Sequence, residues 1–230
     1  MKKQEQLDTY IHYCMCAMGG FFGGYAILNR CEVFGSSQTA NLINLVINLL
    51  GRNLSECFIH FGAAALYVAA LALAVVLMKR TRLHMRYVSI FIDFVAILIL
   101  CCLPADMDPM LGLYPIFFAT AMQWSVFSGA QGFASASIFS TNNVKQTVSS
   151  FTAYLCDKEK EHLVKAKFYG GVLLAYHLGV VLAYIGFIYL GLQGAVFGVL
   201  PLLLAAGLVF YAEESPNVKN KIKVAFSEKL

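Results

Sequence analysis

Six long apolar segments constrain the fold of this chain more than any other feature. They cover about residues 10–28, 55–78, 87–104, 111–129, 166–190 and 194–212, and each approaches the 20 or so residues that a helix needs to cross a bilayer. The chain of 230 residues is 59% hydrophobic and 13% charged, which is too apolar for a soluble domain. We therefore expect an all-α integral membrane protein with one membrane domain, and a tail over residues 213–230.

Two further segments, 36–51 and 141–156, are helix-like but polar. The basic loop "KRTRLHMR" at 79–86 is expected inside the cell and the acidic loop "ADMDPM" at 105–110 outside it. If both polar segments enter the membrane and return on the same side, 14 of the 17 Lys and Arg residues lie inside. Eight full crossings would instead place both termini outside. The charge distribution favours six transmembrane helices plus two re-entrant helices, with both ends of the chain in the cytoplasm. Full crossing of the bilayer by the two polar segments remains the alternative.

The expected topology divides the chain into two units of the form span, polar segment, span, span. The first covers about residues 10–104 and the second 111–212, and the second begins on the opposite side of the membrane. An offset of 105 residues aligns Phe34 with Phe139 and Asn41 with Gln146. The pattern predicts an inverted repeat with broken helices near the middle of the bilayer, as in many transporters and channels.

Backbone that is not helical is tolerated at membrane depth only inside protein or beside water, so both polar segments must face inward. Helix N-termini attract anions and polar oxygens, and two of them meeting near the midplane would form a polar chamber. The alternative is that these side chains only cap backbone groups and join helices. The candidate solute-binding residues are Ser36, Ser37, Gln38, Thr39, Asn41, Gln123, Ser140, Thr141, Asn142, Asn143, Lys145 and Gln146.

Asp93 and Lys145 are the ionisable residues expected clearly at membrane depth. Such residues often mark a transport route or pair with each other. We expect either a charge pair or a proton relay. In the alternative, Lys145 extends to the inner interface and Asp93 hydrogen-bonds a neighbour.

Several function classes lack a supporting pattern. The seven cysteines form no CxxC pair and no cluster with histidine, so neither a metal site nor a cofactor is expected. No nucleophile with a base and no phosphate loop is found, so the chain is not expected to be an enzyme. The net charge of +4 is explained by cytoplasmic loops, and binding to nucleic acid is not expected.

The stretch "GGYAILNRCEVFGSSQTANLINL", with Phe34 five residues before Thr39-Ala40-Asn41, resembles the F-x-x-x-x-T-G-N signature of the YoaK-type family of small bacterial membrane proteins. The stretch "ATAMQWSVFSGAQGFASASIFSTNNVKQTV" resembles that family's second block. The resemblance covers about residues 10–212, although Ala40 replaces the glycine and Val144-Lys145-Gln146 stands in place of a second Thr-Gly-Asn. It implies the inner membrane of a bacterium and no established activity.

These observations lead to two expectations about function. The first is a transporter or channel for a small polar or anionic solute, with the lipid bilayer as its surroundings. The second is a membrane protein that transports nothing and whose polar segments bind a partner or form a homodimer.

Overall fold

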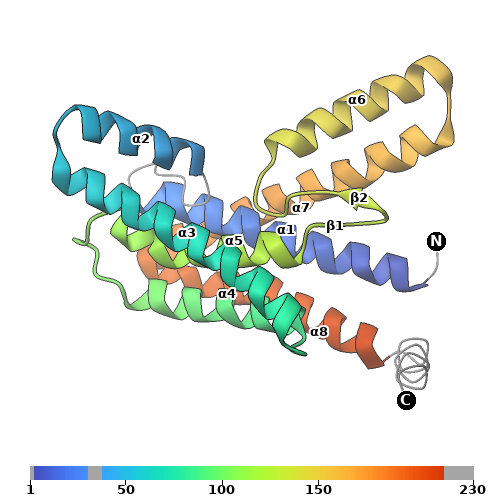
Figure 1. Ribbon diagram of the computed structural model, residues 1–230. Coiled ribbons are helices and arrows are strands. Elements are labelled where there is room, and N and C mark those ends of the chain that lie inside the picture. The colour runs from blue at the N-terminus through green and yellow to red at the C-terminus, as the bar shows by residue number, and fades with distance from the viewer. Residues whose placement is uncertain (1–2, 31–37, 215–230) are drawn as a thin grey trace.

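The computed structural model describes residues 3–30 and 38–214, which are mostly helical. Figure 1 shows the long helices side by side in one bundle, with two helical hairpins projecting from it. Two short 3-10 helices, η1 (Leu111–Leu113) and η2 (Gly191–Gly198), precede α5 and α8. The α-helices of this part of the chain are α1 (Lys3–Asn29), α2 (Gln38–Leu50), α3 (Leu54–Arg80), α4 (Met85–Cys102), α5 (Tyr114–Val126), α6 (Thr141–Asp157), α7 (Lys160–Leu190) and α8 (Val199–Glu214).

The described helices include 4 stretches that are long and apolar enough to cross a membrane. They are α1, α3, α4 and a continuous stretch, Lys160–Glu213, that contains both α7 and α8. This stretch folds back at η2, where a Cβ on Gly194 would overlap the carbonyl oxygen of Gly186. The prediction of an all-α membrane fold is confirmed at this level.

Helix α5 is shorter than the span expected at 111–129. It has 13 residues, or about 20 Å at 1.5 Å per residue, whereas the hydrocarbon core is about 30 Å thick. It ends shortly before a small hairpin of β1 (Gly129–Ala130) and β2 (Phe133–Ala134). Gln131 and Gly132 between the strands both have positive φ, as a type I′ turn requires.

Helix α1 is the centre of the bundle and packs against α7 and α8. Its contact with α7 is close because glycine lies on both sides. A Cβ on Gly20 would overlap the carbonyl oxygen of Tyr176, and one on Gly179 would overlap that of Ala17. Small residues allow such backbone contact between membrane helices, and the "GGFFGG" sequence at 19–24 supplies them on α1.

The two projecting hairpins are built alike. Helix α2 packs against α3, and α6 packs against α7. Each hairpin reverses over a few residues, with a basic residue in the left-handed conformation: Arg52 has φ 58° and Lys158 has φ 62°. Both α2 and α6 begin near the middle of the molecule and run toward opposite ends of it (Figure 1).

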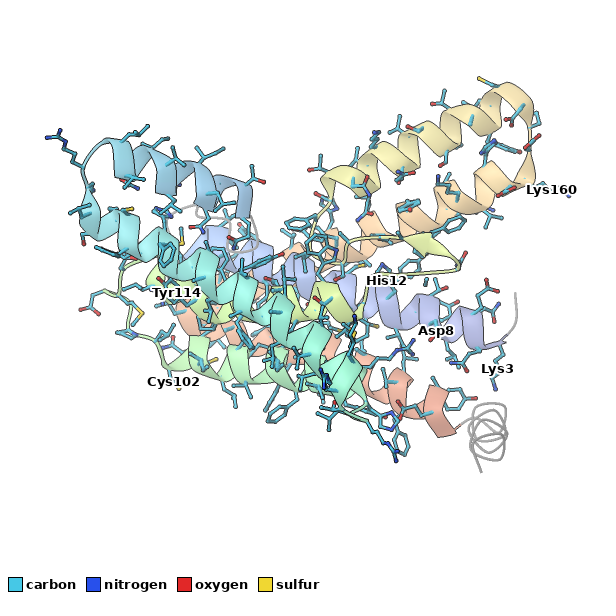
Figure 2. The ribbon with its side chains drawn as sticks, viewed as in Figure 1. Lys3, Asp8, His12, Cys102, Tyr114 and Lys160 are labelled. Carbon is cyan, nitrogen blue, oxygen red and sulfur yellow. The ribbon has the colours of Figure 1, made fainter. Side chains whose placement is uncertain are left out.

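One end of the bundle collects ionic contacts from helices that are distant in sequence. Arg86 at the start of α4 pairs with Asp8 of α1 at 2.8 Å. Lys3 donates to the hydroxyl of Tyr211 near the end of α8 at 2.9 Å. The start of α1, the start of α4 and the end of α8 therefore share one end. Figure 2 shows Lys160 toward this end and Cys102 and Tyr114 toward the other.

The contact between α1 and α7 predicts a position-specific effect of added volume. Gly179→Val should lower the free energy of unfolding by about 1–3 kcal/mol or more, because overpacking displaces neighbours and here the neighbour is backbone. Gly207→Val is the matched control, since no atom lies within 4 Å of a Cβ there. Thermal unfolding of the detergent-solubilised protein measures the difference. Equal stability of the two variants would contradict this account of the packing.

Candidate functional site

The chain between α5 and α6 is not helical, yet much of it lies inside the bundle. Over residues 127–140, Ser137 and Ile138 are 0% exposed and Ser135 is 3% exposed. A Cβ on Gly19 of α1 would overlap the carbonyl oxygen of Ser137. The segment therefore lies directly on α1, so its polar backbone groups need partners within the protein.

Two buried amide side chains supply such partners. Gln123 of α5 donates to the carbonyl oxygen of Met15 on α1 and to the hydroxyl oxygen of Ser137, both at 2.9 Å. Asn143, in the first turn of α6, donates to the carbonyl oxygens of Ala136 at 3.0 Å and Phe139 at 2.8 Å. These bonds join α1, the non-helical segment and the start of α6.

The first polar segment also anchors its helix through a buried asparagine. Asn41, in the first turn of α2, donates to the carbonyl oxygen of His60 on α3 at 3.1 Å. Its Oδ1 lies 2.8 Å from Nδ1 of the same histidine, and this nitrogen must carry the proton because Oδ1 can only accept. His60 is thus a hydrogen-bonded core residue that fixes the α2–α3 hairpin.

Asn41 and Asn143 lie in similar environments, which the alignment of the two halves does not predict. The offset of 105 residues aligned Asn41 with Gln146, but Gln146 is partly buried and lies in the second turn of α6. Asn143 is the residue in an environment like that of Asn41, since both are buried in a first helical turn and donate to backbone carbonyls.

The remaining candidate residues divide into an inner and an outer set. Ser36 and Ser37 lie outside the described residues. Gln38, Ser140 and Gln146 are partly buried, and Gln38 accepts from Asn41 at 3.2 Å. The exposed members are Thr39, Thr141, Asn142 and Lys145. Capping of α6 by its N-cap side chain is not seen, because Ser140 makes no such hydrogen bond.

Asp93 and Lys145 are not brought together. Asp93 of α4 is 0% exposed, and neither carboxyl oxygen has a hydrogen-bond partner within residues 3–30 and 38–214. Lys145 is exposed on α6 and forms no salt bridge with a described residue. The expected charge pair is therefore absent from this part of the chain.

Sequence reasoning did not select some buried polar residues. His12 of α1 is buried and stacks on Phe168 of α7 with ring centroids 5.8 Å apart, and neither ring nitrogen has a partner in the described residues. Figure 2 shows His12 along α1, between Asp8 and the middle of the molecule. Ser89, Ser135 and Ser137 are also buried. For His12 and Ser89 the available signal was an isolated polar residue in an apolar helix, which serine and histidine give only weakly. Ser135 and Ser137 lie in the non-helical segment and gave no such signal.

A polar hollow opens at the end of the bundle that carries the ionic contacts. It has a volume of about 570 Å³ and is lined by residues of α1, the start of α4 and the β-hairpin. The residues are Gln4, Glu5, Asp8, Arg86 and Gly129–Gly132. Gln131 of this hairpin donates to Thr9 at 3.0 Å, so the hollow lies beside the part of α1 that leads to His12.

The fold and the site together define a helical membrane protein with a buried non-helical segment between two of its helices. A family model described as "Protein of unknown function (DUF1275)" matches residues 11–210. The chain belongs to this family. No curated protein and no solved structure matches it.

The buried amides predict a contrast between adjacent asparagines. Asn143→Ala should destabilise the protein by about 1–3 kcal/mol, because it leaves two backbone carbonyls and the Ser135 hydroxyl without their partner. Asn142→Ala is the matched control, since Asn142 is exposed one residue earlier. Thermal unfolding in detergent compares them. If Asn142→Ala costs as much as Asn143→Ala, the hydrogen bonds of Asn143 do not hold the segment.

Proposed function

We propose that this protein is a transporter or channel for a small polar or anionic solute in the inner membrane of a bacterium, with both termini in the cytoplasm. The observation that carries the proposal is the non-helical segment 127–140, which lies on Gly19 inside the bundle and leads into the start of α6. Non-helical backbone at membrane depth is costly unless it is buried in protein or lines a water-filled cavity. In transporters, such breaks surround the solute.

The directions of the two short helices support re-entrant segments. At 1.5 Å per residue, the 13 residues of α2 and the 17 residues of α6 measure about 20 and 26 Å. Each begins near the middle of the molecule and runs outward to its hairpin turn, and the two turns lie toward opposite ends of the molecule (Figure 1). On this proposal, α2 returns to the outside and α6 returns to the cytoplasm.

An inverted repeat is supported by a duplicated contact. Tyr13 of α1 donates to the carbonyl oxygen of Phe168 at 3.2 Å, and its ring lies against Gly171 of α7. Tyr114 of α5 donates to the carbonyl oxygen of Ile59 at 2.7 Å, and its ring lies against Gly62 of α3. In both cases the glycine follows the carbonyl residue by three positions.

The packing between helices repeats in the same way. Helix α1 packs on α7 and α8, as α5 packs on α3 and α4. The hairpins α2–α3 and α6–α7 correspond as well. A two-fold relation that exchanges the halves 10–104 and 111–212 accounts for these pairs together, and it places the two polar helices on opposite sides of the midplane.

The charge at the start of α6 favours an anion. The N-terminus of a helix carries partial positive charge and free N–H groups, and the Ser140 side chain does not cap this one. Lys145 adds a full positive charge one turn later and has no acidic partner in the described residues. A solute carrying a carboxylate, phosphate or similar group fits this potential.

The alternative, a homodimer that transports nothing, is favoured by one surface. The exposed side of α6 carries a polar stripe of Thr141, Asn142, Lys145, Ser149 and Thr152. Next to it runs an apolar stripe of Val144, Val148, Phe151 and Leu155. Polar side chains facing lipid are costly, so the polar stripe must line water or contact a second copy of the chain.

Removal of the lysine charge tests the anion proposal. With a panel of small anions and neutral metabolites, the solute that raises the unfolding temperature should bind the Lys145→Met variant about tenfold or more weakly, because a hydrogen bond to a charged group contributes about 1.5–3 kcal/mol. Lys160→Met removes an exposed charge at the start of α7 and should leave affinity unchanged.

The same panel separates transport from dimerisation. A bound solute must raise apparent stability if it prefers the folded state, and vesicles containing the protein should take it up. If no solute shifts the unfolding temperature, and if Lys145→Met and Ser149→Leu instead change the mass measured in detergent, the homodimer replaces the transporter.

A further inference from the structure

We propose that Asp93 and Ser89 of α4 form a cation-binding site inside the bundle, which holds a proton or a sodium ion. Both residues are 0% exposed. Both carboxyl oxygens of Asp93 and the hydroxyl oxygen of Ser89 lack a hydrogen-bond partner in residues 3–30 and 38–214. The two residues are four positions apart, so they lie one above the other on the same face of the helix.

The depth of the site makes an unpaired carboxylate unsustainable. Asp93 is the ninth of the 18 residues of α4, about 12 Å along the helix from its start. Apart from Ser89 and Arg86 nearer the start of the helix, this side of α4 buries apolar residues, namely Ile90, Ala96, Ile97 and Leu100. Removing a carboxylate from water costs several kcal/mol even after relaxation. A positive charge must therefore accompany the carboxyl group, either bonded to it as a proton or coordinated by it as a metal ion.

The surrounding helices supply no such charge from their side chains. Helix α4 packs mainly against α5, η2 and α8, and none of these elements carries a lysine, arginine or histidine. Tyr114 of α5 donates to Ile59, Tyr211 of α8 accepts from Lys3, and Glu213 of α8 pairs with His84 at 3.3 Å. On α4 itself, Arg86 is held by Asp8. The residues of η2 contain no ionisable side chain.

On this proposal, the cation enters from the end of the bundle that carries the ionic contacts. Arg86, Ser89 and Asp93 lie at positions i, i+3 and i+7 and so share one face of α4. Arg86 lines the polar hollow of about 570 Å³ described above, and also a second hollow of about 430 Å³ with His84 and Glu213. Ser89 is the next residue inward on that face, and Asp93 follows it.

The chemistry of the site suits a small cation. A neutral carboxyl group can donate its proton to a hydroxyl oxygen, and the serine hydroxyl can donate in return. Sodium would take the same oxygen atoms as ligands, together with water. Occupancy of the site does not depend on the function proposed above. Its coupling to solute movement rests on that function, because binding energy can drive solute only through a shared conformational change.

Infrared spectroscopy of the full-length protein in lipid vesicles tests the site without transport. In sodium-free buffer at neutral pH, wild-type protein should show a carbonyl band of a protonated carboxylic acid that Asp93→Asn removes. Ser89→Ala keeps the carboxyl group and should shift the band, which covers the case in which Asp93→Asn fails to fold. Asp106→Asn, at an exposed aspartate in the loop after α4, is the matched control and should leave the band unchanged.

Exchange of choline chloride for sodium chloride identifies the cation. Loss of the band, or a sodium-specific rise in unfolding temperature that Asp93→Asn abolishes, assigns sodium. A band that sodium does not alter assigns the proton. The proposal is overturned if wild-type protein and Asp93→Asn have the same spectrum and the same response to sodium. Failure of the solute panel would leave this result untouched, so the two proposals fail separately.

Discussion

The whole architecture depends on how backbone amides are satisfied where the chain is not helical. Lipid offers no hydrogen bonds, so the segment between α5 and α6 must be bonded within the protein. Gln123 and Asn143 provide these bonds from the two flanking helices. Gly19 provides the space, because any larger residue would collide with the carbonyl of Ser137. These three residues accommodate a non-helical segment in the middle of an apolar bundle.

The same physical argument links the fold to function. A chain that needed only to fill a membrane would continue α5 to full length, yet α5 ends after 13 residues. The shortening leaves room for the entry of α6, whose first turn presents Thr141 and Asn142 at the surface. Tyr13 and Tyr114 make matching contacts in the two halves, and these contacts are the basis of the proposed inverted repeat.

Much of this fold could be predicted from the sequence, because hydropathy acts over whole segments. The positions of α1, α3, α4, α7 and α8 follow from apolar length alone. The length of α5 could not be predicted in this way, since Val126, Phe127 and Ala130 are as apolar as a helix core. The helix nevertheless ends at Val126, where Phe127 leaves the helical conformation (φ −109°, ψ 66°) and Gly129 has φ 144°. The similar burial of Asn41 and Asn143 could not be predicted either, because a single alignment offset ignores loops of unequal length. The burial of Ser89 depends on tertiary packing, which periodicity does not report.

The most direct test is the membrane side of the α6–α7 turn. In a variant that lacks the seven native cysteines, Lys160→Cys and Arg52→Cys are labelled separately with an impermeant maleimide, first in intact cells and then after the membrane is opened. If both polar helices are re-entrant, Arg52→Cys reacts in intact cells and Lys160→Cys reacts only in opened ones. Labelling of Lys160→Cys in intact cells would mean that α6 crosses the bilayer, and the central claim would be wrong.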